Sequence, residues 1–156
     1  MGKTHELLSQ RQWLGIPLRQ LLQRELGPYA GTSNIDLSGS EVILGAEAGQ
    51  TLAMVLHELT TNASKYGALS EHDGRIEIDW RVEQRPDKPP RLKLEWRECD
   101  GPPVQAPARS GFGSRFIQGS VASELQGVAR MEFEPEGLCC TLDIPLEPEK
   151  PEPEHS

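Results

Sequence analysis

The stretch from about residue 47 to residue 66 constrains this 156-residue chain more than any other. Three polar side chains in it, Glu58, Asn62 and Lys65, fall within an arc of roughly 60° when the stretch is drawn as a helix. That arc borders an apolar stripe with the i, i+3, i+4, i+7 spacing of an amphipathic helix. The sequence therefore predicts a half-buried helix with a carboxylate, an amide and an ammonium group along one side. The stripe consists of Leu52, Val55, Leu56, Leu59 and Ala63.

These three polar side chains suit a phosphate ester with a divalent cation better than they suit packing. Asn62 offers a hard oxygen to Mg²⁺, and Lys65 offers a compact positive charge to phosphate. Glu58 has the chemistry to orient a nucleophile or a water molecule. His57 lies away from their arc, and a structural hydrogen bond to a neighbouring backbone carbonyl is the simpler interpretation of it. A zinc-protease helix is excluded, because Thr61 stands where the second histidine must be.

Composition narrows the class of protein. The length fits one domain, and the net charge of −8 argues against nonspecific binding to nucleic acid or to an anionic membrane. We find no apolar run of transmembrane length and no signal-peptide pattern, and we expect no direct membrane contact. The three cysteines, Cys99, Cys139 and Cys140, form a poor disulfide or zinc pattern. We interpret them as reduced thiols of a cytoplasmic protein.

Alternation of apolar and polar residues predicts the strands of a sheet. Two short strands, 34–37 and 41–44, are separated by Ser38-Gly39-Ser40, and this turn predicts a hairpin between them. Short connections between the other strands indicate mainly antiparallel pairing. Those longer strands are predicted at 75–82, 92–98, 128–134 and 138–144.

Helical spacing predicts two further helices. One covers 5–26, with an interruption near Gly15-Ile16-Pro17, where the proline suits the start of a new turn. The other follows Gly111-Phe112-Gly113-Ser114 and ends near Gly127. Helices that cover one face of the sheet would give a two-layer α/β sandwich with a mixed, mainly antiparallel sheet.

Glu98 lies on the same strand face as Leu94 and Trp96, and therefore points toward the core. A carboxylate in that place is costly unless it is paired or meets a ligand. At a strand end it could accept a hydrogen bond from an amino group such as N6 of adenine. The alternative is a glutamate at the sheet rim that pairs with Arg97 or another basic residue, and Asp100 is the rival for the adenine.

The glycine-rich run Gly111-Phe112-Gly113-Ser114 stands before a predicted helix. Glycines let backbone N–H groups approach phosphate, and the N-terminus of the following helix is electropositive. The run is not a P-loop, because it lacks the Gly-Lys-Ser/Thr ending. The alternative is an ordinary turn in which Ser114 is only the helix cap. The preceding residues 102–110 could form a lid over a nucleotide.

Together these elements resemble the catalytic and ATP-binding domain of bacterial sensor histidine kinases, and more narrowly the HWE subfamily of the Bergerat-fold group. The subfamily is named for a histidine in the asparagine-bearing helix and for a Trp-x-Glu sequence further on. The chain has both, as His57 in the run 57–70 and as Trp96-Arg97-Glu98. The glycine-rich run at 111–114 also matches, and the resemblance covers about residues 5–146.

The resemblance implies a role for each candidate residue. Asn62 would bind the Mg²⁺ that bridges the ATP phosphates. Glu58, with His57 beside it as a second candidate catalytic residue, would polarise the attacking imidazole. Lys65 and the glycine-rich run would hold phosphate, and Glu98 would bind the adenine. The implied ATP-binding set is Asn62, Lys65, Tyr66, Glu98, Asp100, Gly101, Gly111, Phe112, Gly113 and Ser114.

The resemblance also implies how the chain is organised. Residues 1–30 would lead from a dimerisation domain that the chain lacks, residues 31–146 would form the catalytic domain, and the acidic residues 147–156 would be a disordered tail. The partners implied are the histidine-bearing dimerisation domain and a downstream response regulator, without nucleic acid. Two other functions stay open: an ATPase or serine kinase of the same fold, and a degenerate module that only docks partners.

Overall fold

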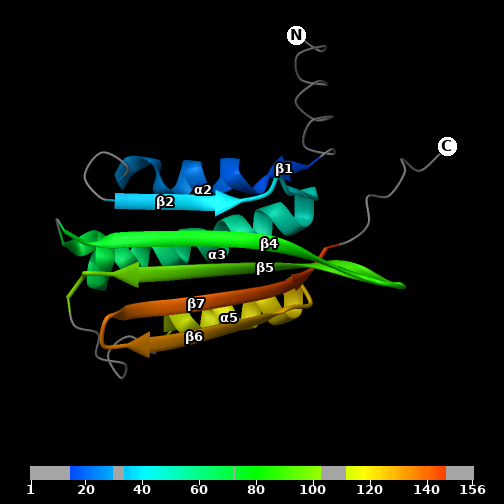
Figure 1. Ribbon diagram of the computed structural model, residues 1–156. Helices are drawn as coiled ribbons and strands as arrows, with labels where there is room; N and C mark the ends of the chain where they lie inside the picture. The colour runs from blue at the N-terminus through cyan, green and yellow to red at the C-terminus, as the bar shows by residue number, and fades with distance from the viewer. Residues whose placement is uncertain (1–14, 30–33, 72, 103–111, 147–156) are drawn as a thin grey trace, which may run out of the picture.

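The computed structural model describes residues 15–29, 34–71, 73–102 and 112–146. In chain order its elements, with η for a 3-10 helix, are β1 (Ile16–Pro17), α2 (Leu18–Leu26), η1 (Gly27–Tyr29), β2 (Asn34–Gly39), β3 (Ile43–Leu44), α3 (Ala46–Tyr66), η2 (Ala68–Ser70), β4 (Arg75–Arg85), β5 (Lys88–Cys99), α5 (Phe112–Glu124), β6 (Val128–Glu134) and β7 (Gly137–Pro145). A five-stranded sheet has the order β2-β4-β5-β7-β6, and α3 and α5 lie on one face of it (Figure 1). The predicted two-layer α/β sandwich with a mixed, mainly antiparallel sheet is confirmed.

Alternating side chains place the central strands between core and solvent. Ile76 and Ile78 of β4 are buried, as are Leu94 and Trp96 of β5, whereas the residues between them are half-buried. In the antiparallel register Ile78 faces Trp96, so the apolar side chains of neighbouring strands share the helix-facing side of the sheet. The strands predicted at 75–82 and 92–98 are confirmed, each with a few more residues.

The helix α3 buries the apolar stripe recognised in the sequence. Every member of the stripe, from Leu52 to Ala63, is at most 1% exposed. The helix packs against α2 on one side and α5 on the other, and all three share one core with the sheet. The predicted helix 47–66 is thus confirmed, with its first residue at Ala46.

The predicted hairpin between residues 34–37 and 41–44 is wrong. Instead, β2 runs parallel to β4, and β3 pairs with β1 in a separate two-stranded sheet. Contacts with distant residues explain the difference, because the indole Nε1 of Trp80 donates a hydrogen bond to the Ser40 carbonyl at 2.7 Å and Arg19 donates to the Gly39 carbonyl at 3.2 Å. The turn residues therefore bind β4 and α2 rather than closing a hairpin.

The predicted interruption of the first helix is confirmed, since β1 occupies residues 16–17 and α2 starts at Leu18. The part of that helix before Gly15, the tail 147–156 and most of the lid 102–110 lie outside the described residues. Among the described residues, no helix combines the length and the apolar character needed to span a membrane.

Candidate functional site

Three elements bring most of the candidate residues to one end of the sheet. Figure 1 shows that α3 ends, β5 ends and α5 begins at this end. The helix α3 packs against α5, and η2, which follows α3, contacts β4. A hydrogen bond of 3.1 Å from the Ala68 backbone N–H to Oε1 of Glu98 joins η2 to the end of β5.

Glu58, Asn62 and Lys65 lie on this part of α3 as the sequence predicts. Glu58 and Asn62 are half-buried, and Lys65 is exposed. None of the three forms an ion pair or a side-chain hydrogen bond with another residue in the described part of the chain. Tyr66, in the last turn, has 55% of its surface exposed. The helix therefore carries a carboxylate, an amide and an ammonium group on one side, without bonds to other described residues.

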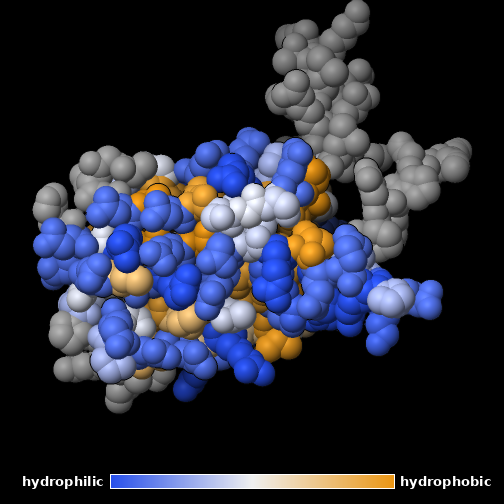
Figure 2. Space-filling model, in the orientation of Figure 1, coloured by the Kyte–Doolittle hydropathy of each residue, from blue (hydrophilic) through white to orange (hydrophobic). Residues whose placement is uncertain are grey.

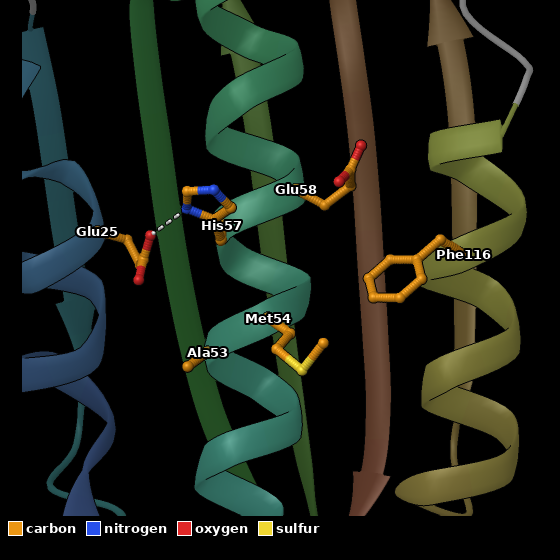
Figure 3. A pocket seen from close by; sticks show the side chains of 6 residues that line it. All are labelled: Glu25, Ala53, Met54, His57, Glu58 and Phe116. Atoms are coloured by element: carbon orange, nitrogen blue, oxygen red, sulfur yellow. Dashed lines mark hydrogen bonds and ion pairs between the residues drawn. The ribbon is translucent and has the colours of Figure 1, made fainter.

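The structure separates His57 from Glu58. In Figure 3 the imidazole points toward α2, where its Nδ1 lies 3.1 Å from Oε1 of Glu25, while Glu58 points toward Phe116 of α5. The His57 side chain is 70% exposed. Its partner is thus a carboxylate on a neighbouring helix and not the backbone carbonyl suggested by the sequence.

An open groove of about 350 Å³ lies beside Glu58, between α2, α3 and α5 (Figure 3). Its lining combines apolar side chains with two carboxylates and an imidazole. Met54, which is 56% exposed, precedes Glu58 by four residues and therefore shares its face of the helix. Sequence reasoning missed this groove, although an apolar residue on the polar face of the helix was a signal. The lining residues are Glu25, Ala53, Met54, His57, Glu58 and Phe116.

Glu98 points into the core, as the alternation of β5 predicts, and is only 4% exposed. Its Oε1 accepts the hydrogen bond from Ala68, and its Oε2 accepts one of 3.0 Å from the indole Nε1 of Trp96. Arg97, the alternative partner considered from the sequence, instead lies on the open face of the sheet beside Glu77. Both carboxylate oxygens are therefore engaged by N–H donors of the chain itself.

The described residues that follow β5 and those that begin α5 include further candidates from the sequence. Asp100 is exposed and has a left-handed backbone conformation, with φ of 57°. Gly101 approaches Ala68 so closely that an added Cβ would lie 2.9 Å from the Ala68 Cα. The helix α5 starts at Phe112, and Ser114 in its first turn is 7% exposed. Gly111 lies outside the described residues, as does the side chain of Phe112.

Two of the three cysteines, Cys139 and Cys140, do not contribute a nucleophile. Burial raises the pKa of Cys139 to about 11, helped by the hydrogen bond that its thiol donates to Glu95 at 3.5 Å. Burial likewise raises the pKa of Cys140 to about 12. Both side chains are therefore neutral thiols at physiological pH.

Comparison with known proteins shows what the chain is similar to. No protein-family profile matches the chain. The chain is 34% identical over 152 residues to the blue-light-activated histidine kinase of Brucella ovis, and 32% identical over 148 residues to that of Brucella anthropi. These matches cover 96% and 94% of the chain but 31% and 30% of the relatives. The chain thus spans about a third of the length of the relatives that it matches.

Solved structures show the same fold. The histidine kinase domain of the Erythrobacter litoralis EL346 blue-light activated histidine kinase superposes with a TM-score of 0.63 at 20% identity, over 84% of this chain and 62% of that one. The catalytic domain of histidine kinase ThkA gives 0.62 at 16% identity, over 86% and 97%. In sequence the chain is thus similar to about a third of these blue-light-activated histidine kinases, and in fold it is similar to histidine kinase catalytic domains.

Proposed function

We propose that the chain is the ATP-binding catalytic domain of an HWE-type sensor histidine kinase. It donates the γ-phosphoryl group of ATP to a histidine on a separate dimerisation domain. The observation that carries the proposal is the set Glu58, Asn62 and Lys65, which lies on one side of α3 without bonds to other described residues. A cytoplasmic site of action, where ATP and reduced thiols occur together, is part of the proposal.

Asn62 and Lys65 suit the phosphates of a nucleotide with a divalent cation. Mg²⁺ usually takes one or two protein oxygens and completes its shell with water and substrate phosphates. Within the described part of the chain, no group of three His, Cys, Asp or Glu side chains could hold a metal ion. The half-buried amide of Asn62 therefore fits an ion that arrives with the phosphates. Lys65, Tyr66 and the N–H groups at the start of α5 would bind the nucleotide itself.

Glu58 suits a role on the nucleophile. A carboxylate that accepts a hydrogen bond from one ring N–H of an acceptor imidazole raises the electron density on the other ring nitrogen, which attacks phosphorus. Glu58 lines the open groove, so a side chain from another domain has access to it. His57 is held toward α2 by Glu25, so its contribution would be to shape the groove rather than to meet the phosphate.

The groove beside Glu58 is the proposed place for the helix that carries the acceptor histidine. Met54 and Phe116 offer apolar contact to such a helix, and Glu25 and Glu58 favour basic residues on it. A response regulator would receive the phosphoryl group afterwards. Another solved structure with this fold, with a TM-score of 0.59 at 19% identity, is histidine kinase ThkA in complex with the response regulator protein TrrA.

A titration with a non-hydrolysable ATP analogue, with and without Mg²⁺, tests the proposal first. We expect saturable binding that strengthens with Mg²⁺. Labelled ATP then identifies the reaction: acid-labile label should form on an added dimerisation domain and not on the isolated chain. Release of phosphate without an acceptor would indicate an ATPase, and acid-stable label on serine would indicate a serine kinase. Absence of nucleotide binding would leave only a docking module.

A further inference from the structure

We propose that Glu98 is a positioning residue, which fastens the end of α3 to the end of β5 and has Trp96 as its second anchor. The three residues Trp96, Glu98 and Ala68 are called the Glu98 link below. In this inference the carboxylate supports nucleotide binding through the turn that it holds, and not by direct contact with adenine. The inference rests on the proposed function only where nucleotide binding is the measured quantity.

The geometry of the Glu98 link is that of an acceptor held between two donors. The Ala68 backbone N–H donates to one carboxylate oxygen at 3.1 Å, and the Trp96 indole N–H donates to the other at 3.0 Å. Trp96 is fully buried, and Ala68 and Glu98 are 1% and 4% exposed. Without the carboxylate, two buried N–H groups would lose these partners, which is a costly arrangement in a protein interior.

Glycines around the Glu98 link are a second, independent observation. A Cβ added to Gly67 would overlap Oε1 of Glu98, and one added to Gly74 would overlap the Ala68 carbonyl oxygen. Gly137, at φ of 152°, would meet the Glu98 carbonyl oxygen in the same way. The chain therefore closes so tightly around Glu98 and Ala68 that Gly67, Gly74 and Gly137, like Gly101, have no room for a side chain.

The position of the Glu98 link in the fold connects it to the site. Ala68 comes directly after the C-cap of α3, so fixing its N–H fixes the helix end that carries Lys65 and Tyr66. Glu98 is the second-last residue of β5 and precedes the exposed Asp100 and the half-buried Gly101 by two and three residues. The Glu98 link thus sets the distance between the two groups of candidate ATP-binding residues.

The chemistry of the link makes a sharp test possible. An ionised carboxylate is acceptor-only, whereas the amide of glutamine has one acceptor and one donor end. In Glu98→Gln the NH₂ group must face either the Trp96 or the Ala68 donor, so one hydrogen bond becomes a donor–donor conflict. The double variant Trp96→Phe/Glu98→Gln removes that conflict, because the glutamine oxygen still accepts from Ala68 and its NH₂ faces an apolar ring.

The experiment measures the thermal midpoint Tm and the Kd for ADP of four proteins. These are the wild type, Glu98→Gln, Trp96→Phe and the double variant. We expect Glu98→Gln to lower Tm by roughly 3–8 °C and to weaken ADP binding about 10-fold. The double variant should recover ADP affinity to within about 2-fold of Trp96→Phe. Glu95→Gln is the matched control, since Glu95 is on the same strand but contacts Cys139, and it should leave ADP binding unchanged.

Two results would overturn the inference. If the double variant binds ADP as weakly as Glu98→Gln, the carboxylate contacts the base directly. If the Tm changes of the single variants simply add in the double variant, Trp96 and Glu98 are not coupled. Hydrogen exchange of the Ala68 backbone amide is measured in parallel. It should be slow in the wild type and fast in Glu98→Ala, because that variant lacks the acceptor of the Ala68 N–H. A wild type that does not bind ADP would refute the proposed function, while Tm and amide exchange would still decide whether the Glu98 link exists.

Discussion

The open face of the sheet and the polar side of α3 carry the same kinds of charged and polar side chain, but these differ in how they pair within the described part of the chain. On the sheet face, which Figure 2 shows as mainly hydrophilic, charged groups pair across strands. Lys93 lies 2.8 Å from Asp143, and Arg97 lies within 4 Å of both Glu77 and Asp79. On α3, Lys65 pairs with no carboxylate in the described part of the chain.

The difference shows that residue type alone does not mark a site. Exposed ion pairs contribute about 0–1 kcal/mol each to the free energy of unfolding, so the ion pairs on the open face of the sheet stabilise the fold modestly. On one side of α3, Lys65, Asn62 and Glu58 form no ion pair or side-chain hydrogen bond with another described residue, so they gain no stability from such a bond. In the proposed function their bonding capacity serves a ligand, and the tests below separate these two uses of charge.

The largest effect is expected at Glu58. In Glu58→Gln, transfer to the histidine of the parent dimerisation domain should fall by about 10²–10⁴-fold, because the amide cannot polarise the imidazole as a carboxylate does. Nucleotide affinity should stay within about 2-fold, since the residue acts on the nucleophile. Initial rates with labelled ATP and a binding titration measure the two quantities. Equal losses of rate and affinity would place Glu58 on the nucleotide instead.

The next effect concerns Asn62. Asn62→Ala removes one oxygen that fits Mg²⁺, so the gain in ATP affinity on adding Mg²⁺ should shrink by about 10-fold or more. Affinity in EDTA should change little. Titrations with and without Mg²⁺ give both values, and Asn62→Asp is the informative companion because it restores an oxygen ligand. An unchanged Mg²⁺ dependence in Asn62→Ala would remove this residue from the metal site.

A matched pair of lysines compares the two regions directly. Lys65→Gln should weaken ADP binding by about 10-fold, the loss of one charge-assisted contact to phosphate, with Tm unchanged. Lys93→Gln should leave ADP binding unchanged and lower Tm by about 2–4 °C, because it breaks the contact with Asp143. The comparison fails if both variants change the same quantity.

The sequence predicts the local elements of this fold better than the contacts between distant residues. The 3.6-residue spacing of α3 and the alternation of β4 and β5 are local signals, and the predicted helix, strands and polar arc are confirmed. The pairing of β2 with β4 was missed because it depends on contacts 40 residues apart, such as Trp80 with Ser40. For the same reason the sequence placed Glu98 inward but not its partner Ala68, which is 30 residues away.

The smallest expected effect concerns the ion pairs on the open face of the sheet, whose contribution to stability should depend on pH. Burial opposes ionisation of Asp143, but hydrogen bonds from Lys93 and Arg91 outweigh it and hold the pKa of this carboxyl below its ordinary value of 3.8. Its contribution to stability is therefore fully present above pH 3.8 and is lost as pH falls through the lower pKa of the folded state.

The wild type should accordingly exceed Asp143→Asn by about 1 kcal/mol in free energy of unfolding near neutral pH, and the gap should close in strong acid. Urea denaturation of both proteins at a series of pH values measures it. Asp79→Asn is the control, because Asp79 is 49% exposed and lies 3.4 Å from Arg97, so its gap should be smaller at every pH. ADP affinity should not change in either variant, because neither carboxylate lies at the end of the sheet where α3 ends and α5 begins. A gap that persists in strong acid would mean that Asp143 stabilises the fold by packing and not by its charge.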